Sequence, residues 1–377
     1  MDVSVILTYR CNSRCSMCYI WQNPTLPREE VSLSSLGKIP HGVDYLNLTG
    51  GEPTIREDLE DIVELLYHKA KTLEISSNGT HPERLEPIIK RHPDVKVRFS
   101  LEGIGETNDR IRGERGGFER KVQGLIRLKE LGGTDLGFAI TIQDDNARQL
   151  IEVFRLAKRH GFELATSSIH NGYQFHKADN VLYDRPGVAR EIEGLITEML
   201  KTNKVKNWFR AYLNLGLIRK VLGQPRLLKC TAATDFVFID PWSDVYACNV
   251  RPDLKLGNLE RNSWEELLNG VRASEIWKSV DACQQNCWMV GSAKTAMRNR
   301  RYSNLPRWAP LRWVLANKAR VTLGFQIPFE RFVDYSAANR DPVTPLRPFF
   351  IEQKGVKRNM HRAQGPEYER FGEFFNR

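Results

Sequence analysis

The sequence lacks the features that would place the protein in a membrane or outside the cell. It has no run of about 18 apolar residues, which argues against a membrane-spanning helix. No charged and then apolar leader precedes the first expected strand, which begins by Asp2, so we expect no signal peptide and a cytoplasmic location. Cysteine is scarce, and because its count of seven is odd the thiols cannot all pair as disulfides. In such a chain, cysteines more often bind metal or take part in catalysis.

The first 290 residues also lack a net charge, although the whole chain carries +10. Residues 291–377 hold 17 Lys and Arg against 7 Asp and Glu, which accounts for the entire excess. Within this segment, residues 311–323 predict a basic amphipathic helix. Three roles fit the segment: packing against the rest of the protein, peripheral contact with a membrane or lipid-linked substrate, or docking of a peptide or polyanion. Its scattered arginines and aromatics match no nucleic-acid motif, so we expect no nucleic-acid partner.

Three cysteines follow directly on a short apolar run near the start of the chain. Residues 3–8 predict a buried strand, and Cys11, Cys15 and Cys18 come next with the spacing C-x3-C-x2-C. Three thiolates that converge on one point suit an iron–sulfur cluster, because soft sulfur ligands hold iron well. A four-iron cluster has four corners, so three cysteines leave one iron open to another ligand. A zinc site or inert core cysteines are the alternatives.

The first half of the chain alternates between strand patterns and helical patterns. Strands are expected at residues 3–8, 45–49, 72–77, 95–101, 136–142 and 162–169. Helices are expected between them, at residues 32–38, 56–69, 82–91, 118–131 and 147–159. This order predicts an α/β fold in which a parallel sheet is covered by helices.

The cysteine loop and its position after a strand resemble the radical S-adenosylmethionine (SAM) superfamily, whose signature is C-x3-C-x-Φ-C. The Φ position, usually aromatic, is Met17 here, and a thioether can also pack on an adenine ring. The resemblance implies a partial (β/α)6 TIM-like barrel with its chemistry at the C-terminal ends of the strands. It also implies a [4Fe-4S] cluster on Cys11, Cys15 and Cys18 whose open iron binds SAM. Reductive cleavage of SAM then gives a 5′-deoxyadenosyl radical that abstracts hydrogen from a substrate.

Small and polar residues at several strand ends are expected to face SAM. In the resembling family, a Gly-Gly-Glu-Pro turn like residues 50–53 holds the amino group of SAM, and glycines allow the backbone to approach a ligand. Residues 109–113 resemble a family loop, in which Arg112 either clamps a carboxylate or is solvated. Each of these segments also fits an ordinary polar turn. The expected SAM-site residues are Met17, Gly50, Gly51, Glu52, Pro53, Ser76, Asn78, Ser100, Glu102 and Arg112.

A second group of cysteines lies in the last third of the chain. Cys230 and Cys248 are separated by 17 residues, and Cys283 and Cys287 follow with the spacing C-x3-C. Between the first two, residues 236–239 and 244–247 flank a Pro-containing turn and predict a hairpin that brings both cysteines together. Residues 257–259 predict a turn, and Ser263 predicts the cap of a helix that returns the chain to the last two cysteines.

This layout resembles the twitch extension of certain radical SAM enzymes, a shortened SPASM domain. A full SPASM domain carries seven cysteines, so the four present here imply one auxiliary [4Fe-4S] cluster bound by Cys230, Cys248, Cys283 and Cys287. A zinc ribbon is the alternative, since four thiolates also suit tetrahedral zinc.

The predicted organisation has four parts. Residues 1–180 form the barrel core, 181–228 a helical connection with helices near 188–200 and 208–222, 229–290 the twitch-like domain, and 291–377 the basic extension. At the end of the sixth strand, His170 or His176 can serve as a proton donor or acceptor, although surface loop histidines are the commoner case.

Three functions compete. The first hypothesis is an oxidoreductase that oxidises a small hydroxylated molecule, such as a sugar or cyclitol. Four cysteines would leave the auxiliary cluster no open corner for a substrate, so this cluster would more plausibly accept an electron, which gives a net oxidation. Modification of a peptide or protein is the second hypothesis; the chain begins at the barrel with no leader-binding domain, which we take to favour the first. A non-catalytic zinc- or iron-binding protein is the third. Both enzymatic hypotheses imply an electron donor such as flavodoxin or ferredoxin.

Overall fold

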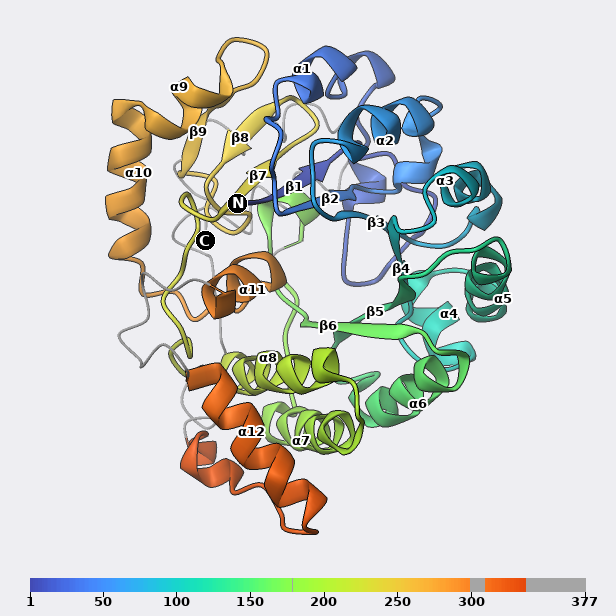
Figure 1. Cartoon of the computed structure of the whole chain (residues 1–377), viewed down its shortest axis with the longest axis vertical. Coiled ribbons are helices and arrows are strands. Elements are labelled where there is room, and N and C mark those ends of the chain that lie inside the picture. The colour runs from blue at the N-terminus through green and yellow to red at the C-terminus, as the bar shows by residue number, and fades with distance from the viewer. Residues whose placement is uncertain (178, 299–308, 337–377) are drawn as a thin grey trace.

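Nine strands form one continuous sheet in the computed structural model, which describes residues 1–177, 179–298 and 309–336 (Figure 1). Their order is β6-β5-β4-β3-β2-β1-β7-β8-β9. All pairs from β6 to β7 are parallel, whereas β8 is antiparallel to both of its neighbours. The strands are β1 (Asp2–Ile6), β2 (Tyr45–Thr49), β3 (Leu73–Ser77), β4 (Lys96–Ser100), β5 (Leu136–Ile142), β6 (Glu163–Ser168), β7 (Phe236–Ile239), β8 (Asp244–Tyr246) and β9 (Lys255–Asn258).

Helices cover the outside of the curved parallel strands (Figure 1). The sheet stays open, with β6 and β9 as its edges, so the predicted α/β partial barrel is confirmed. The helices are α1 (Leu33–Gly37), α2 (Leu59–Tyr67), α3 (Glu86–Arg91), α4 (Glu106–Arg112), α5 (Gly117–Glu130), α6 (Leu150–His160), α7 (Arg185–Lys201), α8 (Val205–Val221), α9 (Trp264–Asn269), α10 (Val271–Asp281), α11 (Val290–Arg298) and α12 (Ala309–Thr322).

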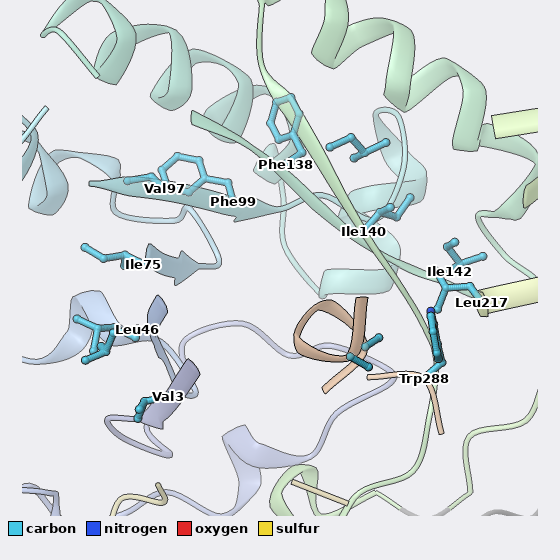
Figure 2. Close-up of a cluster of buried hydrophobic side chains, with 14 of the residues drawn as sticks. Val3, Leu46, Ile75, Val97, Phe99, Phe138, Ile140, Ile142, Leu217 and Trp288 are labelled. Atoms are coloured by element: carbon cyan, nitrogen blue, oxygen red, sulfur yellow. The ribbon is translucent and has the colours of Figure 1, made fainter. Parts of the chain in front are cut away.

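Alternating side chains separate a hydrophobic layer from a polar interior. On β2, Leu46 and Leu48 are fully buried in the core shared with the outer helices, whereas the intervening Asn47 is only partly buried. Figure 2 shows buried apolar side chains from β1 through β5 in this core. Because successive side chains of a strand point to opposite faces, the polar positions are left to face the inside of the barrel. There Ser76 donates a hydrogen bond of 3.0 Å to Asn47.

Three local predictions are wrong. Residues 109–113 were expected in a loop, but they end α4, which stops at Gly113 because that residue takes the left-handed conformation with φ 63°. Residues 257–259 were expected to turn, but 255–258 form β9, which pairs with β8 across an irregular register. The single helix expected after Ser263 is divided at Gly270 into α9 and α10.

The helices α7 and α8 lie side by side beyond β6, near the ranges expected for them (Figure 1). The predicted basic helix is α12, which packs on both through Trp313 and Val314. Packing against the rest of the protein therefore describes this part of the segment. Residues 299–308 and 337–377 lie outside the described part of the chain. None of the described helices has the length and apolar character needed to cross a bilayer.

Helix α11 closes the N-terminal end of the barrel. Asp2, the first residue of β1, is buried, and its carboxylate accepts a hydrogen bond of 2.5 Å from Arg298. Lys294 lies over the ring of Tyr45, the first residue of β2, and 3.9 Å from the Asp2 carboxylate. The opposite, C-terminal ends of the strands therefore hold the accessible mouth of the barrel.

Candidate active site

The three N-terminal cysteines open into a cavity of about 330 Å³ at the C-terminal ends of the strands. We call this the N-terminal cysteine cavity. Five hydroxyl-bearing residues from five consecutive strands line it, one near the end of each: Thr49, Ser76, Ser100, Thr141 and Ser167. It is lined further by Cys11, Ser13, Cys15, Met17, Cys18, Ile20, Trp21, Gly50, Gly51, Ser77, Asn78, Arg112, Ile169, His170 and Phe175. Parallel strands thus bring together residues that are far apart in the sequence.

The thiols of this loop have no disulfide partner, and Cys15 is the most deeply buried. Burial raises the pKa of Cys11 and Cys18 to about 12, so thiolates form here readily only with a bound cation. Within the described residues, no three His, Cys, Asp or Glu side chains are arranged to hold a single metal ion. The cysteine sulfurs of a polynuclear cluster attach to different irons, and three soft thiolates suit such a cluster.

The turn after β2 touches the backbone that leads into the cysteine loop. A Cβ on Gly51 would lie 2.3 Å from the carbonyl oxygen of Arg10, so only glycine fits there. The next carboxylate, that of Glu52, is fully buried and accepts hydrogen bonds from Thr54, from the Ser77 hydroxyl (2.9 Å) and from the Asn78 backbone (2.5 Å). Its side chain therefore ties the turn to the end of β3.

Three of the expected SAM-site residues do not line the cavity: Glu52, Pro53 and Glu102. The Glu52 carboxylate is occupied by hydrogen bonds from the turn and the end of β3, and Pro53 begins the short 3-10 helix η3 (Pro53–Ile55). Glu102 is also buried, and its carboxylate accepts a hydrogen bond of 2.7 Å from the Thr141 backbone. The other seven expected residues do line it: Met17, Gly50, Gly51, Ser76, Asn78, Ser100 and Arg112.

Arg112 lies behind the cysteine loop in a buried charge network. Its guanidinium is 3.3 Å from Glu102 and 3.8 Å from Glu114, and Glu114 also pairs with the fully buried Lys121. Ser13, which lies between the first two cysteines, donates a hydrogen bond to Glu114. The alternative of a solvated arginine is therefore wrong. The guanidinium also opposes the pKa rise of Cys15, so it favours a thiolate there.

We expect Lys121→Met to lower the free energy of unfolding by about 3 kcal/mol, because Glu114 would be left buried with one cation fewer. Arg127→Ala is the matched control: its contacts with Glu86 and Glu130 are exposed, and a change within about 0.5 kcal/mol is expected. Chemical denaturation of both variants measures the difference. Equal losses in the two variants would contradict a structural role for the buried pair.

The four C-terminal cysteines line a separate cavity of about 220 Å³, which we call the C-terminal cysteine cavity. Cys230 and Cys248 lie on either side of the β7–β8 hairpin, and Cys283 and Cys287 follow α10. The backbone of Val250 lies 3.3 Å from the Cys248 sulfur as a hydrogen-bond donor. The guanidinium of Arg226 lies 3.6 Å from the sulfur of Cys287. Donors of this kind tune the potential of a bound iron–sulfur cluster.

His170 and His176 differ in their surroundings. His170 lines the N-terminal cysteine cavity, and its Nδ1 lies 3.3 Å from the Ser168 carbonyl. Burial and the nearby Lys220 ammonium lower its pKa to about 3, so its ring is neutral at pH 7. Burial also lowers the pKa of Lys220, to about 8, which leaves that group protonated at pH 7. His176 instead packs edge-on against the ring of Tyr9 and does not line the cavity.

Several residues that line the cavity are not in the expected SAM-site set, among them Thr141, Ser167, Trp21 and Phe175. Thr141 and Ser167 lie on the expected fifth and sixth strands, and their alternation with apolar neighbours was the available signal. Trp21 and Phe175 come from irregular segments. The Trp21 indole donates a hydrogen bond of 3.0 Å to the Cys18 carbonyl, a contact that no short sequence pattern reveals.

Comparison with known families agrees with this geometry. Residues 5–157, which contain the end of β1, the N-terminal cysteine loop and the strands β2 to β5, match the model of the radical SAM superfamily. The chain belongs to the radical SAM superfamily. Residues 230–288 match an iron–sulfur cluster-binding domain of SPASM type. The protein is therefore a radical SAM enzyme whose cofactors are a [4Fe-4S] cluster, SAM and auxiliary iron–sulfur.

Relatives of this radical SAM enzyme fall into two groups by how much of the chain they match. The mycofactocin maturase of Mycolicibacterium smegmatis is 28% identical over 303 residues, which cover 74% of this chain and 76% of that protein. The antilisterial bacteriocin subtilosin biosynthesis protein of Bacillus subtilis is 22% identical over 324 residues, which cover 80% and 70%. The Fe-coproporphyrin III synthase of Methanosarcina barkeri is 33% identical, but over only 40% of this chain and 39% of that protein.

Solved radical SAM structures share the fold. The structure titled anSMEcpe with bound AdoMet matches 88% of this chain and 97% of its own, with a TM-score of 0.57 and 16% identity. The structure of SuiB of Streptococcus suis bound to S-adenosylmethionine matches 76% of this chain and 72% of its own, with a TM-score of 0.55 and 15% identity. At this identity the agreement concerns the arrangement of helices and strands.

Proposed function

We propose that the enzyme modifies a peptide by radical chemistry, rather than oxidising a sugar or cyclitol. The observation that carries this proposal is that the relatives matching most of the chain are named as a maturase and a bacteriocin biosynthesis protein. Their matches extend over at least 70% of their own length, so they include more than the barrel. The tetrapyrrole-forming relative matches less than half of either chain, which makes a tetrapyrrole substrate the weaker candidate.

We assign the [4Fe-4S] cluster to Cys11, Cys15 and Cys18, and the auxiliary cluster to Cys230, Cys248, Cys283 and Cys287. The first cluster supplies one-electron cleavage of bound SAM. The glycines of the turn after β2 let the backbone approach the methionine end of SAM, and Met17 offers a thioether to its adenine. The polar side chains that complete this assignment are Ser76, Asn78, Ser100 and Arg112.

The buried acids of this region act through other residues in the proposed mechanism. Glu52 positions the turn and the end of β3, and Glu102 orients Arg112 behind the cysteine loop. Trp21, Ile20 and Phe175 supply apolar walls that exclude water from the cavity. We further propose that residues 1–180, 181–228 and 229–290 are the barrel, the connection and the auxiliary-cluster region, and that a flavodoxin or ferredoxin supplies electrons.

Mass spectrometry with the anaerobically reconstituted enzyme tests the function. We would incubate it with SAM, a reductant and short peptides encoded beside its gene, with sugars, cyclitols and a porphyrin in parallel reactions. Peptide modification predicts a peptide-dependent rise in 5′-deoxyadenosine, a mass change in the peptide, and transfer of deuterium from a labelled peptide. Deuterium transfer from a labelled sugar, cyclitol or porphyrin alone would contradict it.

A further inference from the structure

A narrow pocket of about 50 Å³ lies between the two cysteine cavities. We call it the bridging pocket. It shares Ile169 and His170 with the N-terminal cysteine cavity, and Val250, Gln285 and Cys287 with the C-terminal cysteine cavity. A substrate group bound here would therefore lie beside the place of hydrogen abstraction and also beside the proposed auxiliary cluster.

The lining of the bridging pocket is cationic. Lys220 of α8 and Arg185 of α7 both line it, and no Asp or Glu is among the described residues that do so. The residue Lys220 is nine-tenths buried. In the described part of the chain it donates one hydrogen bond, 3.1 Å long, to the Ser168 carbonyl and pairs with no carboxylate. Because a buried charge is costly unless it is paired, such an ammonium favours a bound anion.

Two residues that line the pocket also carry a buried neutral polar atom that lacks a partner among the described residues. The Ser168 hydroxyl is buried in a residue that is 1% exposed, and it makes no hydrogen bond. The His170 Nε2 is likewise buried and unpartnered. Buried polar atoms are satisfied in most proteins, so unsatisfied ones in residues beside a pocket need a partner there, such as a water or a ligand group. The remaining ammonium protons of Lys220 and the Ser168 hydroxyl together offer donors for an oxyanion.

We propose that the bridging pocket binds a carboxylate group of the substrate, held by Lys220 and Ser168, and so places the adjoining carbon at the His170 wall of the N-terminal cysteine cavity. This deepens the proposed function, because a peptide offers carboxylates at its C-terminus and on acidic side chains. The pocket volume suits the carboxylate and little more of the substrate. Arg185 adds positive charge to the same wall, and its Nε donates a hydrogen bond of 2.8 Å to the Val221 carbonyl.

Small carboxylates test this site without turnover. We would follow thermal unfolding of the anaerobically reconstituted enzyme with increasing sodium acetate, with acetamide as the neutral analogue and sodium chloride at matched ionic strength. A ligand that binds only the folded state raises the unfolding temperature with its concentration. Acetate is expected to raise it, whereas acetamide and chloride are not. Equal effects of acetate and acetamide would overturn the proposal, whatever the substrate of the enzyme.

Variants locate the effect. Lys220→Met is expected to weaken acetate binding by at least about tenfold, since it removes the charged donor. Lys318→Met is the matched control. The Lys318 ammonium also donates hydrogen bonds to backbone carbonyls, those of Leu200 and Thr202, but Lys318 does not line the bridging pocket. Ser168→Ala, which preserves packing, is expected to weaken binding severalfold and serves if Lys220→Met does not fold.

The outcomes separate this site from its alternatives. If Lys220 only offsets the charge of the Cys287 thiolate, Lys220→Met will alter the iron content while acetate binding stays unchanged, and the proposal fails. N-Acetylglycine and N-acetylaspartic acid α-amide then distinguish a chain-end carboxylate from an acidic side chain. Tighter binding of either one supports the site and identifies the source. If acetate binds as expected but no peptide is modified, the proposed function fails and the carboxylate site remains.

Discussion

Cys15→Ala enzyme is expected to form no detectable 5′-deoxyadenosine from SAM. Cys15 is the most buried of the three cysteines that line the N-terminal cysteine cavity, and alanine offers no sulfur in its place. With two thiolates remaining, the cluster loses a ligand and SAM cleavage loses its source of electrons. Chromatography and mass spectrometry of the anaerobic reaction, with iron analysis of the same sample, provide the measurement.

Ser16→Ala is the control for this experiment, because Ser16 is the next residue in the loop and its side chain is exposed. Its backbone remains bonded to the Ile111 carbonyl at 3.0 Å, so the loop keeps its attachment to α4. We expect SAM cleavage within about twofold of the unaltered enzyme. Substantial cleavage by Cys15→Ala at full iron content would mean that the assignment of this loop to the cluster is wrong.

Cys283→Ala is expected to keep SAM cleavage but to yield no modified peptide. Cys283 lines the C-terminal cysteine cavity and does not line the N-terminal one, so its loss leaves the SAM site intact. If the auxiliary cluster removes an electron after hydrogen abstraction, the reaction then stops at abortive cleavage. The ratio of peptide product to 5′-deoxyadenosine is the measurement.

The neighbouring Gln284 provides the matched control, since it lines the same cavity with an exposed side chain that carries no thiol. Gln284→Ala should keep both iron content and the product ratio. Product formation that survives in Cys283→Ala would exclude an electron-accepting role for the auxiliary cluster. Loss of SAM cleavage in the same variant would show that the two sites are not independent.

The residues singled out from local sequence in the first cysteine loop and at the glycine turn line one cavity in the structure. The spacing of Cys11, Cys15 and Cys18 after a β-branched run, and the glycines at 50 and 51, depend on contacts within a few residues and on one strand end. The order of strands and helices predicted a parallel sheet covered by helices, and the resemblance to the radical SAM superfamily implied the open barrel.

What the sequence did not reveal depends on contacts between distant residues. Glu102 belongs with Arg112 and the Thr141 backbone rather than in the cavity, because a buried carboxylate requires donors that only the folded chain supplies. The α4 helix was missed because it is only two turns long and its end is defined by one glycine. The bridging pocket joins residues of β6, α7, α8 and the last cysteine loop, which no local pattern connects.

The pairing of β7 with β1 has a mechanical consequence for the enzyme. Four residues of β1, from Asp2 to Val5, align with Phe236 to Ile239 of β7, and the same β1 leads directly into the first cysteine loop. The regions that we propose to bind the two clusters are thus attached to adjacent strands of one sheet. If both clusters bind as proposed, attachment to one sheet would fix the distance between them, on which the rate of electron transfer depends.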